Sequence, residues 1–384
     1  MERRIPEWRF GRGWTDEELS ARLGAVDAAA EVARARSEPA GRQRDVASSG
    51  PLGREAAGAP EPGGLFARAC DLLVAYELSD PRIVAPHFDR AAPLASRPIL
   101  LEIKVLGFRY LCPVVVGDVM SEPETDRTRF GFRVDTVVPH LERGSEWFIV
   151  EKDHRTGAVR FSITARWEPG QFPDRWSRVG FAVLARRYQR AWHRRAHRRL
   201  RDRLNPGAVG PGRGGAAFWA TVARVGAVAG LRSMLAPAAV SLAFDRAGAS
   251  GHGRGGEALA SPASGLILPV LAAGELVADK LPAIPARTAA APLAGRVLAA
   301  AWAASAIAAE SGRRPRARAF AAALGAATAV AAAFAGYHLR RWARRRTRLP
   351  DAVVAVAEDA LALTLAFHLV PPPTRRAAET LPPG

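Results

Sequence analysis

Cysteine is almost absent from this chain of 384 residues, which has only Cys70 and Cys112. Both lie in apolar runs, and neither has a histidine or a second cysteine at the spacing of a metal ligand. A disulfide framework needs several paired cysteines, and a structural metal site needs clustered thiol or imidazole ligands. We therefore expect no disulfides, no metal and no cofactor.

A recognisable catalytic set is also missing. His87 and His140 have no serine, cysteine or carboxylate at the spacing of a triad or metal site, so we expect ordinary surface or core histidines. Asp135 and Glu146 are interpreted as solvated charges on strand faces. The run Gly251–Gly256 has the letters of a dinucleotide fingerprint, but it follows no strand, and we expect a loop. An enzyme is the least favoured class.

Acidic residues are scarce relative to basic ones, with 37 Asp and Glu against 55 Lys and Arg and a net charge of +18. An excess of this size suits either nucleic acid or anionic lipid headgroups. The arginines cluster beside apolar stretches, in 186–203, 313–318 and 340–348. Because positive charge flanks membrane spans on the cytoplasmic side, we expect membrane lipids as partners and do not expect nucleic acid.

The first half of the chain alternates charged and apolar residues, as a soluble domain does. Thr15 and Glu18 have the spacing of a capping box, which predicts a short helix ending near Leu23. Residues 34–64 have no hydrophobic period and are rich in Ala, Gly, Pro and Ser. Such a segment buries too little surface to offset the entropy of ordering it, so we expect a disordered insert.

Strands and one long helix are predicted after this insert. Apolar spacing predicts a helix over 65–76, and period-two alternation predicts strands at 129–139 and 159–165. An apolar run at 147–150 and turn residues before the last strand favour an antiparallel meander. Residues 176–203 have an apolar stripe at helical spacing and are expected to form one helix.

A curved antiparallel sheet packed on a long C-terminal helix can enclose a cavity, and such cavities hold apolar small molecules. The candidate lining residues are Phe132, Val134, Phe161, Ile163, Phe181 and Tyr188. The alternative is that these side chains fill the space as plain core. The sequence leaves both interpretations open.

Several motifs of this half resemble a known family. They are Gly131-Phe132, Thr136 to His140, Glu146-Trp147-Phe148-Ile149-Val150, Gly157-x-Val159-x-Phe161-x-Ile163 and Arg186-Arg187-Tyr188. Over residues 66–192 the sequence resembles the domain of unknown function numbered 1990, also called uncharacterised protein family 0548. It departs from that pattern at Arg166–Pro169, where Ser-Arg-Pro is expected. The resemblance implies an α+β fold similar to lipid-binding helix-grip domains and assigns no activity.

Long apolar stretches dominate the second half of the chain. Each is near the roughly 20 residues that cross a 30 Å hydrocarbon core. Arginines flank them, so we predict an all-α, multi-span domain of the cell membrane, with the front domain cytoplasmic. A soluble alanine-rich bundle is the alternative. The stretches are 216–244, 258–274, 289–309, 319–339 and 352–370.

Arginine blocks at both ends of the fourth stretch conflict with a strict in-and-out count of spans. A broken or re-entrant segment around 262–269 would resolve this conflict.

Charged residues inside these stretches are the strongest functional signal. Each costs several kcal/mol in hydrocarbon unless it is paired or hydrated. Glu275 and Asp279 lie four residues apart on one helix face and are expected to meet Arg232 or a cation. The set is either a group of structural ion pairs or a transport site. Its members are Arg232, Glu275, Asp279, Lys280, Arg287, Glu358 and Asp359.

The same residues carry a second resemblance. Over residues 225–369 the sequence resembles the membrane domain of unknown function numbered 4126, which implies an integral membrane protein with a polar interior site and no known substrate. The motifs are Gly230-Leu231-Arg232-Ser233, Ala236-Pro237, Glu275 to Pro282, Arg287-Thr288 and Glu358-Asp359.

We therefore divide the chain into six parts. They are an N-terminal segment (1–33), a disordered insert (34–64), a cytoplasmic α+β domain ending in an Arg-rich helix (65–203), a linker (204–215), a membrane domain of four or five apolar helices (216–370) and a polar tail (371–384).

Three hypotheses of function follow. The first is that the α+β domain binds an apolar ligand, such as a lipid, and exchanges it with the membrane domain. The second is a secondary transporter or channel in which Arg232, Glu275, Asp279 and Glu358 form the site. The third is an enzyme acting in the front cavity, which a histidine or carboxylate pointing into that cavity would favour.

Overall fold

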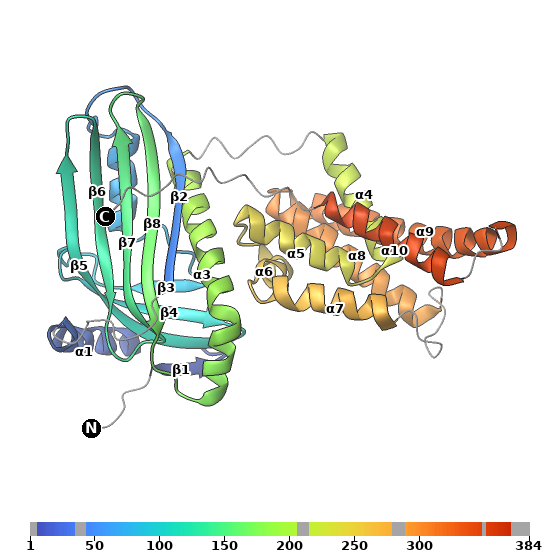
Figure 1. Ribbon diagram of the computed structural model, residues 1–384, viewed down its shortest axis with the longest axis horizontal. Coiled ribbons are helices and arrows are strands. Elements are labelled where there is room, and N and C mark those ends of the chain that lie inside the picture. Colours follow the sequence, from blue (N-terminus) through green and yellow to red (C-terminus); the bar gives the residue numbers. More distant parts are fainter. Residues whose placement is uncertain (1–5, 35–43, 206–214, 279–288, 348–350, 370–384) are drawn as a thin grey trace. The chain divides into compact units, whose positions relative to one another are not determined.

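A computed structural model of the chain describes residues 6–34, 44–205, 215–278, 289–347 and 351–369. The chain divides into two units, Met1–Gly210 and Pro211–Gly384. We call the first the α+β unit and the second the helical unit, and we describe each by itself (Figure 1).

A curled antiparallel sheet forms the α+β unit (Figure 1). Its order is β2-β8-β7-β6-β5-β4-β3, and β1 pairs separately with β5. The predicted meander is confirmed, because β5, β6, β7 and β8 pair in sequence order. The strands are β1 (Glu7–Phe10), β2 (Arg44–Arg54), β3 (Val84–His87), β4 (Pro98–Val105), β5 (Phe108–Pro123), β6 (Arg127–Thr136), β7 (Glu142–Asp153) and β8 (Ala158–Pro169).

Strand β5 gives the sheet much of its curl. Its first half pairs with β4 and β1, and its second half continues along β6. The register with β6 shifts between Val116 and Val119. Because a bulge bends its strand and increases the local twist, the sheet curves into a half-barrel.

Three helices cover this sheet. Helices α2 (Leu65–Val74) and α3 (Arg175–Leu204) contact each other on one face, and α1 (Asp16–Arg34) packs on the other. The predicted long helix is therefore confirmed, with Asp174 as its N-cap, since the Asp174 side chain accepts a hydrogen bond from Ser177 N–H. Figure 1 shows α3 running along the sheet.

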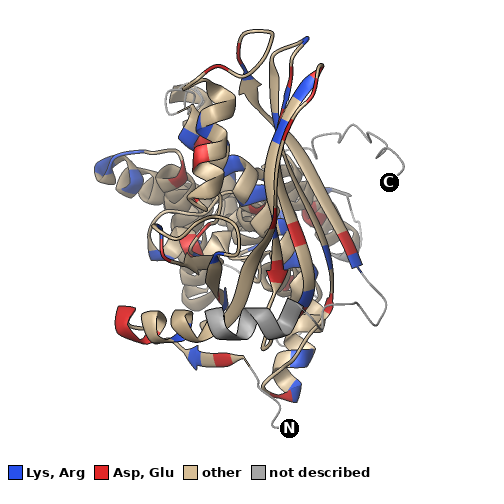
Figure 2. Ribbon diagram, turned by 90° about the vertical axis from the view of Figure 1, so that its left-hand side faces the viewer, with Lys and Arg blue, Asp and Glu red and all other residues tan. Residues whose placement is uncertain are grey.

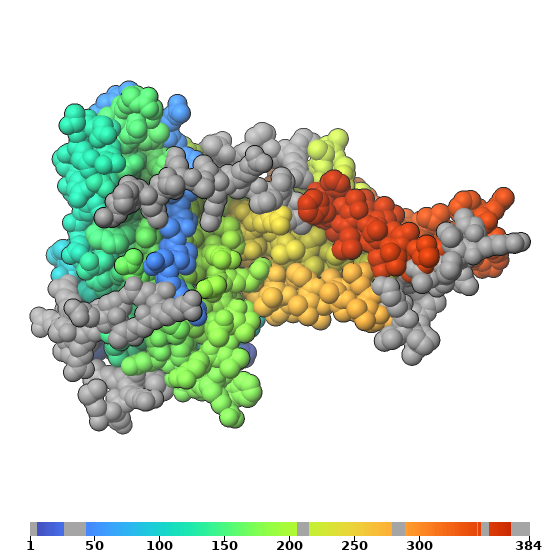
Figure 3. All heavy atoms as spheres, in the orientation of Figure 1, coloured from blue at the N-terminus to red at the C-terminus, as the bar shows by residue number. Residues whose placement is uncertain are grey.

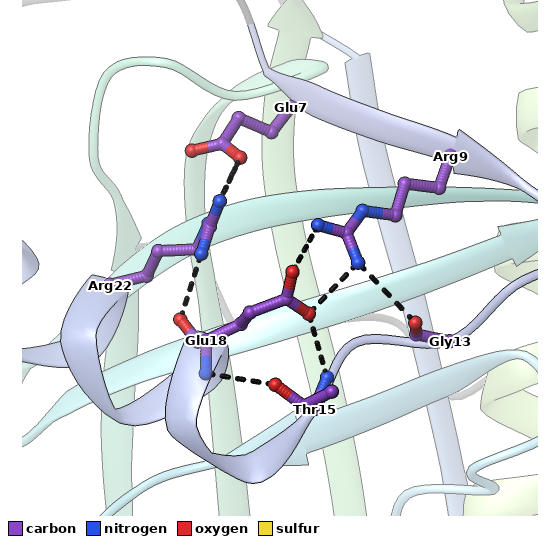
Figure 4. A network of polar contacts seen from close by, with 6 residues as sticks. All are labelled: Glu7, Arg9, Gly13, Thr15, Glu18 and Arg22. Carbon is purple, nitrogen blue, oxygen red and sulfur yellow. Dashed lines mark hydrogen bonds and ion pairs between the residues drawn. The ribbon is translucent and has the colours of Figure 1, made fainter.

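The capping box of α1 is present (Figure 4). Thr15 N–H donates to Glu18 Oε2 at 2.8 Å, and Glu18 N–H donates to Thr15 Oγ1 at 3.2 Å. Arg9 on β1 also binds the Glu18 carboxylate, and this hydrogen bond, with that from Thr15 N–H, lowers the pKa of Glu18 to about 2. The helix does not end near Leu23 as predicted. It continues because Val26 is also buried against the sheet.

The predicted insert at 34–64 is wrong for the part that the structure describes, whereas 35–43 lie outside it. Residues 44–54 are β2, which pairs with β8 from Arg44–Trp167 to Arg54–Ala158. The segment has no hydrophobic period, but a partner strand satisfies its backbone whatever its side chains are. The α+β unit therefore begins well before residue 65.

Charged residues occur along the strands of the sheet (Figure 2), and several of them pair within a strand or between neighbouring strands. Arg133 binds Asp135 at 2.8 Å and Asp118 at 2.5 Å. Asp135 is thus a surface ion-pair partner, consistent with the solvated charge expected there. Arg129 bridges Glu122 and Glu124 in the same way.

Part of the arginine block on α3 is used inside the α+β unit. Arg195 is only 4% exposed and binds Asp80 at 2.7 Å. Arg199 donates to the backbone carbonyl of Glu77 at 2.8 Å. These two residues are therefore not free for lipid headgroups, and they fasten α3 to the segment that follows α2.

Seven helices are described in the helical unit. They are α4 (Gly215–Leu231), α5 (Leu235–Ala247), α6 (Gly253–Ala260), α7 (Ser264–Ala278), α8 (Ala290–Glu310), α9 (Pro315–Thr347) and α10 (Asp351–Phe367). The predicted apolar stretch 216–244 is therefore not one helix. It breaks at residues 232–234, where charged side chains bind the free backbone groups at the end of α4 and the start of α5.

Two of the described helices are long and apolar enough to cross a membrane, Ala290–Glu310 and the Pro315–Ala343 part of α9. A third span results if α6 and α7, which bend by 81° at their junction, form one broken span. This bend lies at the segment around 262–269 for which the sequence predicts a break.

Small residues let these helices approach closely. A Cβ atom at Gly325 of α9 would lie 2.8 Å from the Cβ of Ala304 on α8. Gly226 and Gly230 of α4 similarly face α9. Such glycine and alanine contacts replace large interlocking side chains as the packing element.

Large apolar side chains remain exposed on the outer faces of the helical unit. Val277 is 67% exposed, Leu298 69% and Phe367 68%. The helices α7 and α10, which carry two of them, are visible in the space-filling view (Figure 3). Soluble proteins rarely expose contiguous apolar surface on this scale, so these faces suit an apolar environment.

Candidate functional site

A cavity of about 630 Å³ lies in the α+β unit between the sheet and α3. Strands β4 to β8 supply one wall, and the half of α3 from Trp176 to Trp192 supplies the other. The lining is mainly apolar, and its volume lies within the range of small-molecule sites.

Strand register explains which residues reach the cavity. Val134 on β6, Glu146 on β7 and Ala165 on β8 are direct neighbours across the sheet. Because alternate residues of a strand share a face, all three point to the same side, and all three line the cavity.

The predicted lining residues divide into two groups. Val134, Phe181 and Tyr188 line the cavity, whereas Phe132, Phe161 and Ile163 do not. These last three are 0% exposed. They lie on the correct face of the sheet but further along their strands, where Tyr76 contacts Phe132 and His197 contacts Phe161.

His140 is a buried histidine, which the sequence analysis allowed, and it also lines the cavity. It is 6% exposed, and its Nδ1 accepts a hydrogen bond from Glu142 N–H at 2.9 Å. Burial lowers the pKa of His140 to about 4. The imidazole is therefore neutral at pH 7.

Glu142, two residues later, lines the cavity as well. Burial, with a smaller contribution from the Glu146 carboxylate, raises the pKa of Glu142 to about 8. The group is therefore largely protonated at pH 7 and donates rather than accepts a hydrogen bond. The sequence shows no sign of this, because the shift comes mainly from burial in the folded unit.

A polar chain leads away from the cavity through α3. Glu146 Oε1 lies 3.1 Å from His193 Nε2, and His193 Nδ1 lies 3.0 Å from Ser48 Oγ. His197 Nε2 contacts the same hydroxyl at 2.9 Å. Glu146 is therefore not the freely solvated charge that the sequence suggests.

The order of carboxylate, imidazole and hydroxyl in this chain is that of a hydrolase triad. Ser48, however, is not among the residues that line the cavity, and its hydroxyl contacts two imidazoles. This series of polar contacts thus connects β7, α3 and β2. The sequence analysis did not predict it, because residues 44–54 were not predicted to be a strand.

The entrance of the cavity has an apolar rim. Trp8, Leu106 and Trp176 line the cavity and are also 43%, 52% and 72% exposed. A residue that both lines a cavity and faces solvent lies at its mouth. The cavity therefore opens between β1, the β4–β5 turn and the start of α3.

A second polar cluster surrounds the break between α4 and α5 in the helical unit. Arg296 of α8 donates to the carbonyls of Gly230 and Leu231 at 2.8 and 2.7 Å. Glu275 of α7 accepts from Ser233 N–H, Ser233 Oγ–H and Met234 N–H, each at 2.8 Å. A cation therefore lies at the C-terminus of α4 and an anion at the N-terminus of α5, as the helix dipoles favour.

The remaining predicted charges are placed as follows. Arg232 pairs with Asp359 of α10, and both are buried. Glu275 binds the start of α5 rather than Arg232. Glu358 lies next to Asp359 on α10 and close to Gly336 of α9. Asp279, Lys280 and Arg287 lie outside the described residues. The sequence analysis did not single out Arg296, because arginine is common throughout this chain.

Within the part of the chain described here, no cluster of three His, Cys, Asp or Glu side chains could hold a metal ion. The two cysteines are free. Burial raises the pKa of the Cys112 thiol to about 12, so it is not a reactive thiolate.

The fold and the cavity define an α+β half-barrel closed by a long helix and followed by an apolar helical unit. Residues 27–199 match the family model of a domain of unknown function (DUF1990). The match includes β2 and ends within α3, so it covers nearly the whole cavity. No curated protein matches the chain. The resemblance of 225–369 to the second family stays a prediction.

Proposed function

We propose that the α+β unit binds an apolar small molecule in its cavity and that the helical unit holds the protein in a membrane. The cavity of about 630 Å³, with its mainly apolar lining, is the observation that carries the first part. A mainly apolar cavity of this volume suits an apolar small molecule, which gains packing contacts with its walls on binding.

Membrane attachment is supported by the two helices of spanning length and by the exposed apolar side chains on α7, α8 and α10. The arginines that flank these helices suit anionic headgroups on the cytoplasmic side. We place the protein in the cell membrane as a multi-pass protein, with the α+β unit in the cytoplasm. A ligand of the cavity is then lipid-like and exchanges with the bilayer.

The test is native mass spectrometry of the full chain in lipid nanodiscs, with and without a blocked cavity. Ala165→Phe adds a ring on the cavity side of β8, and Ala158→Phe adds the same ring on the opposite face of that strand as a control. Wild type and Ala158→Phe should retain a co-purifying apolar molecule that Ala165→Phe loses. Equal occupancy in all three proteins would contradict the proposal.

A transporter or channel is the second candidate, favoured by the break between α4 and α5. Broken helices whose ends face a polar centre are a transporter design. The contacts of Arg296 and Glu275 also suffice to stabilise the break without a substrate. Ion flux through proteoliposomes that is lost in Glu275→Gln, while that variant keeps its unfolding temperature, would favour transport.

A further inference from the structure

An exposed apolar patch surrounds the mouth of the cavity in the α+β unit. Trp8, Leu106 and Trp176 line the cavity and also face solvent. Phe10, on the same strand as Trp8, is 66% exposed. The rings of Trp8 and Phe10 both contact Phe108, with centroids 5.6 and 5.0 Å from it. The apolar surface is thus continuous from β1 to the start of β5.

Helix α3 extends this surface away from the opening. Trp176, Val179 and Val183 follow one another at spacings of three and four, so they share one face of the helix. Val179 is 55% exposed and Val183 60%. Contiguous exposed apolar surface of this kind marks an interaction site. We call the whole set the mouth patch, which consists of Trp8, Phe10, Leu106, Trp176, Val179 and Val183.

Positive charge borders the mouth patch on α3. The exposed arginines there are Arg175, Arg178, Arg186 and Arg190. The helix has no carboxylate before Asp202, and Asp174, which precedes it, is held by Ser177 as the N-cap. Tryptophan and aliphatic side chains with arginines at their edge are typical of helices that lie in the headgroup region of a bilayer.

We infer that the mouth patch docks on the surface of an anionic lipid bilayer, with its apolar side chains among the headgroups and the bordering arginines on the lipid phosphates and carboxylates. This inference rests on the proposed function, in which the helical unit holds the chain in a membrane. It places the opening of the cavity against lipid, so an apolar ligand passes between the bilayer and the cavity without entering water.

Charge favours lipid over a second copy of the chain as the occupant. In a two-fold dimer the same patch meets itself. The bordering arginines would then face one another, and like charges across an interface repel. An anionic membrane surface attracts the same charges.

The experiment attaches the fluorophore NBD to single cysteines introduced into the full chain, in nanodiscs of phosphatidylcholine and phosphatidylserine. Nitroxide-labelled lipids quench a probe that lies in the bilayer, and iodide quenches a probe in water. Wild type treated with the same reagent is the blank for Cys70 and Cys112. Burial raises the pKa of both thiols to about 12, so they should react little.

Val179→Cys and Leu106→Cys place the probe on the mouth patch from two different elements. Val119→Cys is the matched control, because Val119 is 41% exposed near the other end of β5. Both mouth-patch probes should be quenched by nitroxide lipid, and iodide should quench them several-fold less than it quenches the probe at residue 119.

The arginines are tested in the Val179→Cys protein, at a phosphatidylserine content where docking is partial. Arg186→Gln should lower the ratio of docked to undocked chains about fivefold, the factor given by about 1 kcal/mol per arginine near an anionic surface. Arg155→Gln removes an exposed arginine from the β7–β8 turn and should leave the ratio unchanged. Equal effects of the two substitutions would contradict docking through α3.

A fourth probe separates the inference from the proposed function. Leu298→Cys, at a 69% exposed position of α8, reports whether the helical unit lies in lipid. If iodide quenches that probe and nitroxide lipid does not, the proposed attachment fails and the inference fails with it. If that probe lies in lipid but iodide reaches the mouth patch as it reaches residue 119, only the inference is wrong. Mouth-patch probes that neither quencher reaches would show a protein contact instead and would also overturn it.

Discussion

His140 and Glu142 show how little a residue's chemistry depends on its immediate sequence. Both belong to a turn and strand start that any surface loop could resemble. Both line the cavity, and burial shifts the pKa of each toward its neutral form. At this scale the cavity is a mainly apolar space whose lining also includes an imidazole and a carboxyl group.

The raised pKa of Glu142 has a measurable consequence for stability. The unfolded chain releases this proton near its ordinary pKa of 4.5, whereas the folded chain keeps it until about pH 8. Stability from this group is therefore lost as pH rises between these values. Replacing Glu142 by Gln, which does not ionise, should stabilise the protein above pH 8 by about 2–4 kcal/mol relative to wild type.

The measurement is the difference in unfolding free energy between the two proteins from pH 4 to 9. The groups acting on Glu142 are Glu146, which raises its pKa, and Arg44, which lowers it. His140 has the opposite pH dependence between pH 4 and 6.5, but it is present in both proteins and cancels. A difference that does not change with pH would show that Glu142 titrates normally.

A buried ion pair offers a second prediction. Lys152 Nζ lies 2.6 Å from Glu55 Oε1, and the Lys152 side chain is 0% exposed. Removing one partner leaves an uncompensated buried charge, so Lys152→Ala should destabilise the protein by about 3–5 kcal/mol in chemical unfolding. Arg166→Ala, which breaks an exposed pair with Asp45, should cost less than about 1 kcal/mol. Similar losses in both variants would contradict this ranking.

At the scale of elements, the junction of α4 and α5 depends on side chains from two other helices. Glu275 accepts three hydrogen bonds at the start of α5, and Arg296 binds the last carbonyls of α4. These contacts explain why charged residues occur in an apolar stretch. Each charge satisfies backbone groups that a break in a helix exposes.

Glu275→Ala should therefore lower the unfolding temperature of the full chain in nanodiscs by several degrees, because it leaves the N–H groups of Ser233 and Met234 without their acceptor. Glu275→Gln keeps one acceptor oxygen and should show a smaller loss. Val277, a 67% exposed side chain on the same helix, provides the control, and Val277→Ala should change the temperature little. An unchanged temperature in Glu275→Ala would rule out the capping role.

Period-two alternation predicted the meander, and apolar residues at helical spacing predicted the long helix. Both signals are local in the sequence. The sequence could not predict β2, since Ser48, Ser49 and Gly50 are held by pairing with β8, more than 100 positions away. It placed Phe132 on the right face of the sheet, but it could not predict that Tyr76 packs against it. His140 was dismissed for the same reason, because its burial comes from distant elements.

At the scale of the whole molecule, the chain joins a unit with a polar outer surface to one with exposed apolar helices. Because the α+β unit and the helical unit have separate hydrophobic cores, we expect each unit to fold independently of the other. A chain ending at residue 210 should be soluble and keep the sheet-rich circular dichroism of the α+β unit, whereas the full chain should sediment with membranes and need detergent for extraction. A truncated chain that aggregates would contradict this independence.

The pairing of β2 with β8 also orders events during biosynthesis. Ser49 and Ser162, which face each other across this pair, are 113 residues apart. The edge of the half-barrel therefore waits for the last strand to be synthesised, and a contact that closes so long a loop forms slowly. The next apolar segment, α4, begins only at Gly215. On the proposed membrane attachment, the first apolar helix follows closely on the last strand of the sheet, so folding of the α+β unit and insertion of the helical unit compete in time.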